Sequence, residues 1–317
     1  MHLPRGLLFQ YAVYLAVRVL SVLLHAAGWR ASYRAGRILA WLLYRLDHRH
    51  RRIALENLAA AYPHLDPARR HRIAQASFRS LVYMGIETLF SVRAVTPTNW
   101  ARRILLRDMG EPIRLMSQGR GVILVTCHFG NFEVAGRLTA AIGLPTVTVA
   151  RRIDNPFLHR YVIELREQAG QRILDKDGAA RRAPAVLESG GTLVLVPDQD
   201  AGPRGVFVDF FGRPAATVKT VALLAAGGNR PLCVITCRRL DEDYHFEVAC
   251  TRVLRPADWA DQADPIRWIT QQFTAAFEHA VRQAPEQYFW MHNRWKTPPG
   301  RLKRIPGQPG RWTLQSR

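Results

Sequence analysis

The sequence predicts an α/β fold, in which a mostly parallel sheet is flanked by helices and preceded by an N-terminal hydrophobic membrane helix. From Gly121 onward, short apolar runs of strand length alternate with stretches of helix length, the pattern of a parallel sheet covered by helices. Polar residues follow several of the apolar runs, as expected where parallel strands end at one rim. Residues 6–29 are mostly apolar and are long enough to cross a bilayer.

The N-terminal region, residues 1–52, is expected to contact a membrane. Gly6 to Trp29 is apolar apart from a few polar side chains such as Arg18, and a second apolar patch, Ile38 to Leu46, precedes a basic cluster that ends at Arg52. Apolar stretches flanked by arginine suit an element that enters or lies along a cytoplasmic membrane face. The alternative is a buried pair of amphipathic helices, and the sequence leaves open whether the first stretch spans the bilayer.

Residues 53–296 are expected to form the α/β domain, and residues 297–317 a flexible tail rich in proline, glycine and charge. An N-cap and a proline at Asp66-Pro67 predict a helix that runs to about Phe90, and a further helix is expected from Trp100 to Ser117. Strands are expected at Val122–Cys127, Thr146–Ala150, Thr192–Pro197, Leu232–Thr236 and His245–Ala249. Further helices are expected at Asn131–Ala141, Asn155–Ala169, Asp177–Glu188, Val218–Ala226 and Asp264–Arg282.

The charge balance favours anionic partners. The formal net charge is +20, from 45 basic against 25 acidic residues, so acidic phospholipid, phosphorylated lipid, an acidic carrier protein and nucleic acid are all candidates. A basic nucleic-acid-binding protein is the alternative from another class, although the sequence contains no recognised nucleic-acid module. The four cysteines lack C-x-x-C spacing, which indicates neither a disulfide framework nor a zinc site.

The candidate catalytic residues are His128 and Glu133. Five residues on an unbroken helix rotate by about 140°, so the two side chains meet only if His128 lies in a strand-to-helix turn, which Gly130 permits. A carboxylate on one imidazole nitrogen leaves the other nitrogen as a base for a hydroxyl, and the implied chemistry is acyl transfer to an alcohol. In the alternative interpretation, Glu133 only stabilises the N-terminus of the following helix, and His128 is a hydrogen-bonded residue without a catalytic role. The neighbouring Cys127 should point to the opposite face and be buried.

Two further strand ends place polar groups on the same rim. Arg151 follows one strand, and Asp198, Gln199 and Asp200 follow another. Arginine holds phosphate or carboxylate through paired hydrogen bonds, but Arg151 is equally suited to pair with Asp198 or Asp200 in a structural network. No third ligand at a recognisable spacing accompanies the aspartates, so no metal site is expected.

A glycine-bounded segment after this rim is rich in aromatic residues. Phe210 and Phe211 are suited to line an apolar slot for a hydrocarbon chain, and Arg204 and Arg213 are suited to bind its head group. The alternative is that both phenylalanines belong to an ordinary core.

Together, these segments resemble the lysophospholipid acyltransferase superfamily and, within it, the bacterial lipid A biosynthesis acyltransferases. The resemblance covers nearly the whole chain, from the apolar N-terminus to Lys296. Arg152 and Ala201 depart from residues that are frequent in the family, and these departures bear on acceptor specificity. The matching motifs are H-x-x-x-x-E at His128 and Glu133, Arg151 with Asp154-Asn155-Pro156, Pro197-Asp198-Gln199-Asp200, Val206 to Gly212, and Pro285 to Lys296.

The resemblance implies a glycerolipid acyltransferase-like fold and a mechanism. His128, oriented by Glu133, is expected to deprotonate a glycolipid hydroxyl, which attacks an acyl thioester of acyl carrier protein or coenzyme A without a cofactor or metal. The expected partners are therefore an acyl-acyl carrier protein or acyl-CoA donor, an anionic glycolipid acceptor and inner-membrane lipid, and no nucleic acid. The implied substrate-binding residues are Arg151, Asn155, Asp198, Gln199, Arg204, Phe210 and Phe211.

The implied location is the bacterial inner membrane, with the active site facing the cytoplasm. Two alternatives remain within the family. One is the same chemistry on another bacterial glycolipid, such as a phosphatidylinositol mannoside, and the other is a member that has lost catalysis and serves as a membrane scaffold. The intact His128 and Glu133 pair argues against the scaffold.

Overall fold

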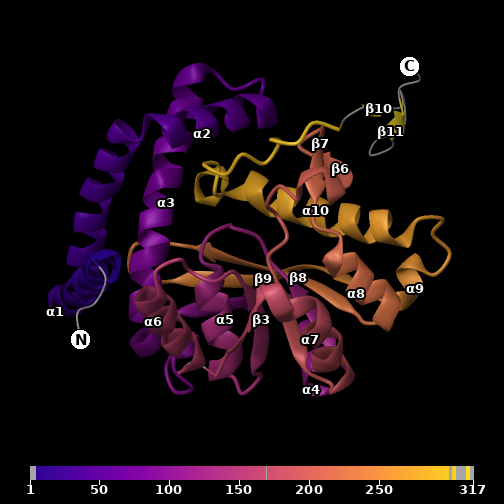
Figure 1. Cartoon of the computed structure of the whole chain (residues 1–317), viewed down its shortest axis with the longest axis horizontal. Helices are drawn as coiled ribbons and strands as arrows, with labels where there is room; N and C mark the ends of the chain where they lie inside the picture. The colour runs from indigo at the N-terminus through magenta and orange to yellow at the C-terminus, as the bar shows by residue number, and fades with distance from the viewer. Residues whose placement is uncertain (1–4, 169, 300–301, 305–311, 315–317) are drawn as a thin grey trace.

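A seven-stranded sheet lies at the centre of the computed structural model, which describes residues 5–168, 170–299, 302–304 and 312–314 (Figure 1). The strand order is β1-β9-β8-β2-β5-β3-β4. Neighbouring strands run parallel except for β8 and β9, which form an antiparallel pair. The predicted α/β fold with a mostly parallel sheet is therefore confirmed.

Strands and helices alternate through much of the chain, with helices on both faces of the sheet (Figure 1). The strands are β1 (Ile104–Arg107), β2 (Val122–Val125), β3 (Thr146–Ala150), β4 (Arg172–Asp175), β5 (Thr192–Leu195), β6 (Val206–Phe210), β7 (Arg213–Thr217), β8 (Leu232–Arg239), β9 (Phe246–Leu254), β10 (Leu302–Arg304) and β11 (Trp312–Leu314). The helices are α1 (Arg5–Leu46), α2 (His48–Ala61), α3 (Pro67–Ala94), α4 (Gly110–Ser117), α5 (Phe132–Ala141), α6 (Pro156–Glu167), α7 (Lys176–Glu188), α8 (Thr220–Gly228), α9 (Pro256–Trp259) and α10 (Pro265–Gln283), with short 3-10 turns η1 (Trp100–Arg102), η2 (Gly202–Arg204) and η3 (Pro285–Gln287).

The helix expected from Trp100 to Ser117 is wrong in its first half. That segment forms η1 and the edge strand β1, and only its second half is helical, as α4. Ile104 is buried while its neighbour Leu105 is exposed, the two-residue alternation of an edge strand. Asp108 then adopts a left-handed φ of 54°, which ends the strand and prevents one continuous helix.

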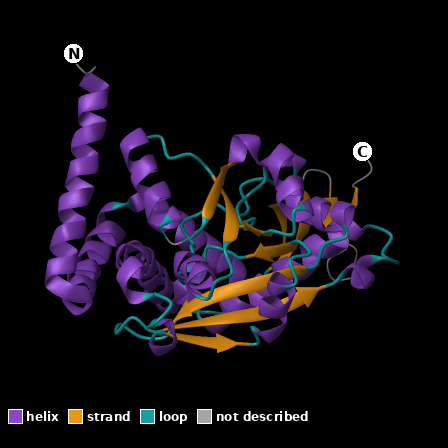
Figure 2. Ribbon diagram, turned by 90° about the horizontal axis from the view of Figure 1, so that it is seen from below, coloured by secondary structure: helices purple, strands orange, loops and turns teal. Residues whose placement is uncertain are grey.

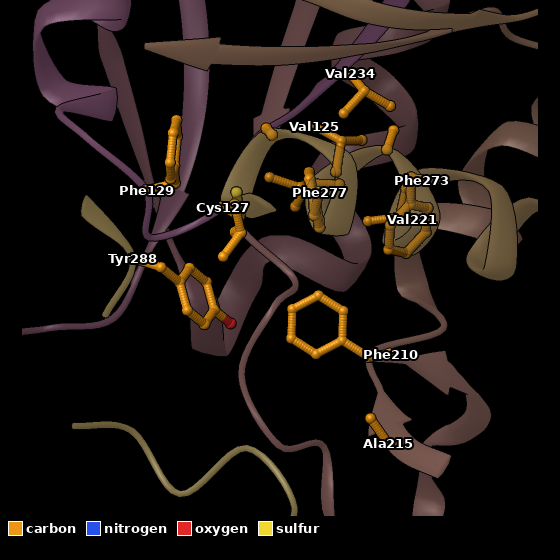
Figure 3. Packing of buried hydrophobic residues seen from close by; sticks show 14 of the residues in the cluster. Val125, Cys127, Phe129, Phe210, Ala215, Val221, Val234, Phe273, Phe277 and Tyr288 are labelled. Carbon is orange, nitrogen blue, oxygen red and sulfur yellow. The ribbon is translucent and has the colours of Figure 1, made fainter. Parts of the chain in front are cut away.

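Strand β2 is buried on both faces, which accounts for its unbroken apolar run. Ile123 and Val125 belong to one core cluster, whereas Val122 and Leu124 belong to another on the opposite face. The first cluster includes residues of α8 and α10 (Figure 3). Because β2 is fixed from both sides, the position of the residues that follow it is determined by the core.

The N-terminal hydrophobic stretches form one kinked helix, α1, in which Gly28 is non-helical (φ 76°, ψ 166°). Among the described residues, α1 is the helix long and apolar enough to cross a membrane, with a mean hydropathy of 1.9 in its best window and only 6% of that window buried. Large apolar side chains such as Phe9 and Val22 are exposed, so the alternative of a buried helix pair does not describe this segment. In Figure 2 the helix that starts at the N-terminus projects beyond the rest of the protein.

A buried ion pair joins α3 to the sheet. The Glu87 carboxylate is fully buried and accepts two hydrogen bonds from the guanidinium of Arg239, at the end of β8. It also accepts hydrogen bonds from Tyr33 Oη of α1 and Asn131 Nδ2, both at 2.8 Å. A buried charge is tolerated only when it is paired and hydrogen-bonded, and here one carboxylate links α1, α3, β8 and the residue that precedes α5.

The tail expected at residues 297–317 lies largely outside the described residues. Residues 300–301, 305–311 and 315–317 are not described, and the backbone of the described part contains the antiparallel pair β10 and β11.

Candidate active site

The turn that follows β2 presents His128 at the carboxyl ends of the parallel strands. Gly130 has a φ of +56°, and a Cβ at this residue would lie 1.8 Å from the carbonyl oxygen of Cys237, so only glycine fits. The same carbonyl accepts a hydrogen bond from the N–H of Asn131 at 2.9 Å. The turn predicted from Gly130 is therefore locked against the end of β8, with His128 in the position that the sequence predicted.

Asp198 is the hydrogen-bond partner of the His128 imidazole. Its Oδ1 lies 2.6 Å from His128 Nδ1, and its Oδ2 accepts the backbone N–H of His128 at 2.9 Å. Strands β2 and β5 are parallel neighbours with Val125 opposite Leu195. His128 and Asp198 each lie three residues beyond this matched pair, so the strand register brings them together.

The environment favours the ionic forms of both groups. Burial alone lowers the pKa of His128, but the charge and hydrogen bond of Asp198, together with the charge of Glu133, raise the pKa above its ordinary 6.5. Burial raises the pKa of Asp198, yet the charge and hydrogen bonds of His128 hold it below its usual range. Asp198 therefore remains a carboxylate and stabilises a protonated imidazole.

Glu133 has a different hydrogen-bond partner from the one expected. Asn131 caps α5 by accepting the N–H groups of Glu133 and Val134, which places Glu133 in the first turn as predicted. Its carboxylate, however, forms a bidentate ion pair with Arg166 of α6, with a 3.0 Å bond from Nε. The expected hydrogen bond between His128 and Glu133 is therefore absent, since Nδ1 of His128 is engaged with Asp198. A guanidinium matches both carboxylate oxygens, and the charge of Glu133 still raises the pKa of His128.

The segment after α10 supports the site from the other side. The N–H of Gly130 donates to the Gln287 carbonyl at 2.9 Å, and the N–H of Phe289 donates to the His128 carbonyl at 3.0 Å. The Gln287 side chain accepts the Arg239 N–H and donates to the Arg239 carbonyl. The sequence analysis identifies this segment only as a motif and predicts neither its contacts with the His128 turn nor the ion pair of Arg166. The high density of aromatic and amide side chains in the segment is the one feature that points to such contacts.

The side chain of Asp200 also ties this C-terminal segment to the rim. Its oxygens accept hydrogen bonds from the N–H and hydroxyl of Thr297, and its backbone N–H donates to Nε2 of His292 at 2.8 Å. Burial lowers the pKa of His292, which agrees with a neutral imidazole that accepts a hydrogen bond.

The expected substrate-binding arginines and Gln199 are exposed. The Arg151 side chain is 81% exposed and approaches Asp154 at 3.9 Å, so the alternative in which it pairs with Asp198 or Asp200 is not the arrangement in this structure. Arg204 and Gln199 are also exposed. Their roles in substrate binding stay predictions.

Asn155 has a structural role at the start of α6. Its side-chain oxygen accepts the N–H groups of Phe157 and Leu158, and its Nδ2 donates to the carbonyl of Gln10 in α1 at 2.8 Å. It therefore caps one helix and fastens it to the N-terminal helix.

Phe210 and Phe211 belong to the core, as the alternative interpretation held. Both are buried, and the ring of Phe210 lies 5.9 Å from that of Tyr288, next to Cys127 (Figure 3). Phe211 packs against Phe210, Tyr62 and Trp290. Contact with an acyl chain stays a prediction for these two residues.

Cys127 is unsuited to nucleophilic attack. Its side chain is buried, and burial together with the nearby charge of Asp198 raises the pKa of the thiol well above its usual value, so the reactive thiolate is disfavoured. Within the described ranges, no group of three or more histidine, cysteine or acidic side chains has the arrangement of a metal site.

The arrangement at His128 suits proton transfer from a hydroxyl. The Nδ1 atom is engaged with Asp198, which leaves Nε2 for a substrate, and the side chain is 25% exposed. A histidine held in this way has the geometry required of a general base.

Comparison with known proteins identifies the family. The sequence profile of the bacterial lipid A biosynthesis acyltransferases matches residues 3–297. The chain is 26% identical to the lipid A biosynthesis lauroyltransferase of Escherichia coli K12, over 84% of this chain and 86% of the relative. It is 27% identical to the palmitoleoyltransferase of the same organism, over 79% and 80%.

A second group of relatives matches a shorter part of the chain. A phosphatidylinositol mannoside acyltransferase of Mycolicibacterium smegmatis is 32% identical over 38% of this chain and 41% of the relative. All of these relatives are acyltransferases of lipids, and the profile covers almost the whole chain. This protein is therefore an acyltransferase and belongs to the bacterial lipid A biosynthesis acyltransferase family.

Proposed function

We propose that this protein transfers a fatty acyl chain from an acyl thioester, on acyl carrier protein or coenzyme A, to a hydroxyl group of a lipid A precursor. The observation that carries the proposal is the pair of His128 and Asp198 at the carboxyl rim of the sheet, in a chain of this family. The pair supplies a base, and no cofactor is required because the thioester already provides the driving force.

In the proposed reaction, Nε2 of His128 accepts the proton of the acceptor hydroxyl as its oxygen attacks the thioester carbonyl. The C–S bond of the tetrahedral intermediate then breaks, and the imidazolium returns the proton to the departing thiolate. The products are the acylated lipid and the free thiol of the carrier. Asp198 holds the imidazole with Nε2 outward and stabilises its protonated form.

Glu133 is proposed to complete the catalytic group through its charge. It contributes to the raised pKa of His128 while its oxygens are held by Arg166. The proposal therefore keeps the pair His128 and Glu133 that the motif predicted and adds Asp198 as the residue that orients the ring.

The proposed location is the bacterial inner membrane, with the site on the cytoplasmic side. The long apolar helix α1 supports association with a membrane. The net charge of +20 favours encounters with an acidic carrier protein, a phosphorylated acceptor and anionic lipid.

A second acceptor class is favoured by one specific observation. The local identity to a phosphatidylinositol mannoside acyltransferase reaches 32%, although over a shorter segment. The same base and the same thioester chemistry would serve a mannoside hydroxyl, so the two candidates differ in the acceptor alone.

The acceptor is tested with purified, detergent-solubilised protein. The protein is incubated with either tetra-acylated lipid A precursor or a phosphatidylinositol mannoside as acceptor. The donors are thioesters of acyl carrier protein or coenzyme A with several chain lengths, and the product masses are measured by mass spectrometry. Addition of one acyl chain to the lipid A precursor supports the proposal. Acylation of the mannoside alone would replace it with the second candidate, and transfer to neither would contradict both.

A further inference from the structure

An open groove separates the second half of α1 from α3, away from the residues around His128. Its volume is about 610 Å³. The α3 side is lined by Arg72, Gln75, Ala76 and Arg79, whose spacing of three and four residues places them on one face of the helix. Ala40 on α1 and Ala76 on α3, which have small side chains, also line the groove.

Two arginines of the groove have no close acidic partner, although Asp66 and Arg72 interact at longer range. Arg72 and Arg79 form no ion pair or side-chain hydrogen bond with any residue that the structure describes. The third arginine, Arg37, pairs with Glu242 at 2.5 Å. Like charges on one face of a helix repel each other, and an anion that accepts hydrogen bonds from both guanidinium groups relieves that repulsion.

The α1 side of the groove is apolar and exposed. Ile38 and Trp41 line it and are 64% and 47% exposed. Leu42 and Leu46 continue the exposed apolar surface toward the end of the helix. Tryptophan is favoured where a membrane meets water, and large exposed apolar side chains beside arginine are typical of a membrane-binding surface.

We propose that this groove binds the head group of an anionic phospholipid, with the phosphate between Arg72 and Arg79 and the start of the acyl chains against Trp41 and Ile38. A phospholipid satisfies both sides of the groove, because it joins a phosphate to hydrocarbon within one molecule. An acidic protein would form ion pairs with the arginines but leave the apolar side of the groove exposed. The apolar helix α1, which borders the groove, also brings this surface to the membrane.

The lipid would bridge α1 and α3. The same helix α3 supports the active site on another face, where Ser77 Oγ donates to the Tyr288 carbonyl at 2.5 Å. Since a ligand that binds only the folded state stabilises it, the bound phospholipid is expected to raise the unfolding temperature of the full-length protein.

The test is native mass spectrometry of the full chain in detergent, titrated with phosphatidylglycerol or phosphatidylcholine of identical acyl chains. The wild-type protein is expected to retain one phosphatidylglycerol in preference to phosphatidylcholine. The double variant Arg72→Gln with Arg79→Gln should bind it roughly tenfold more weakly or worse, because each arginine near a lipid surface contributes about 1 kcal/mol. The matched control, Arg69→Gln with Arg93→Gln, removes the same charge from exposed positions of α3 outside the groove and should bind as the wild type does.

Two competitors separate the phospholipid from other anions. Neither a large excess of inorganic phosphate nor acidic acyl carrier protein is expected to displace phosphatidylglycerol. Displacement by phosphate would indicate a free-anion site, and loss of carrier-protein binding in the double variant with unchanged lipid binding would indicate a protein-docking surface. Either result overturns the proposal, as does equal binding of the two phospholipids by the wild type.

A second measurement covers the case in which the double variant is unstable. Phosphatidylglycerol with brominated acyl chains should quench the fluorescence of the wild-type protein more than that of Trp41→Phe, because the proposed pose brings the acyl chains to Trp41. Equal quenching in the two proteins would contradict that pose. Neither measurement requires turnover, so the result is independent of the proposed acyl transfer.

Discussion

Asp198 holds His128 at two atoms, with 2.6 Å between Oδ1 and Nδ1 and 2.9 Å between Oδ2 and the backbone nitrogen. One carboxylate thus fixes both the ring and the turn that carries it. The two residues are 70 positions apart, and they meet because β2 and β5 end together at the rim of the sheet.

The substitution Asp198→Asn should lower the rate of transfer and shift its pH dependence. Catalysis requires neutral His128, so kcat/KM rises with pH through the pKa of this residue, which lies above 6.5 in the wild type. Removing the negative charge lowers that pKa, and the rising limb should move to lower pH while the maximal rate falls by roughly 10²-fold or more. A pH–rate profile checks both effects, and an unmoved limb would show that Asp198 does not set the pKa of His128.

Whereas kcat/KM rises with pH, the stabilisation of the fold by the pair of His128 and Asp198 falls as the pH rises. Because the folded pKa of His128 is raised, the contribution of the ion pair is fully present below the unfolded pKa of the histidine. It is lost as the pH rises through the folded pKa. In Asp198→Asn this loss on raising the pH should be smaller than in the wild type, as measured by thermal unfolding at several pH values.

The substitution Glu133→Gln should reduce transfer by roughly 10²-fold and also move the rising limb to lower pH, because the charge of Glu133 raises the pKa of His128. The matched control is Arg166→Gln, which removes the other member of the ion pair but keeps the carboxylate. If Glu133 serves only to hold α6 through Arg166, the two variants will lose activity equally and neither will shift the pH profile. That outcome would remove Glu133 from the catalytic group.

The substitution Gly130→Ala should abolish activity and lower the unfolding temperature, because the new Cβ would collide with the Cys237 carbonyl at 1.8 Å. Gly143→Ala is the control, since Gly143 has a comparable φ of +80° and no atom within 4 Å of the added methyl group. It isolates the cost of left-handed backbone in an alanine, about 1–2 kcal/mol. Thermal unfolding and transfer are measured on both, and similar behaviour of the two variants would contradict the proposed close contact at Gly130.

The substitution Glu87→Gln should destabilise the protein by about 3–5 kcal/mol, because it leaves the buried guanidinium of Arg239 without its counter-charge. An exposed pair provides the comparison: Arg52→Gln breaks the contact with Glu56, where both side chains are mostly exposed, and should change stability little. Denaturant unfolding in detergent measures the difference. An equally small effect of Glu87→Gln would show that the buried network does not stabilise the fold.

Much of the fold could be predicted because apolar runs and turn residues were strong signals. The strands at Val122, Thr146 and Thr192 and the helices behind them lie where periodicity and caps placed them. Strand direction was not predictable in the same way: β8 and β9 are antiparallel, and an apolar run carries no information about the direction of its neighbour. The edge strand β1 was missed because its alternation is too short to distinguish from a helical turn.

The sequence predicts which residues lie at the carboxyl edge of the sheet, but it does not predict their hydrogen-bond partners. His128 and Asp198 were both expected there, yet their pairing depends on the register between β2 and β5, which the sequence does not reveal. The sequence favours Glu133, the nearest carboxylate along the chain, as the partner of the imidazole, because it does not reveal that Arg166 lies beside Glu133. Similarly, the burial of Phe210 and the capping role of Asn155 follow from packing against Tyr288 and from the start of α6.

The central claim, that His128 is the base for acyl transfer to a lipid hydroxyl, is tested most directly by single-turnover transfer with His128→Ala. Purified wild-type and variant proteins, shown by circular dichroism to be equally folded, receive saturating acyl carrier protein thioester and tetra-acylated lipid A precursor. The account predicts that the variant forms the acylated product about 10²- to 10⁴-fold more slowly. Product formation at the wild-type rate would contradict it.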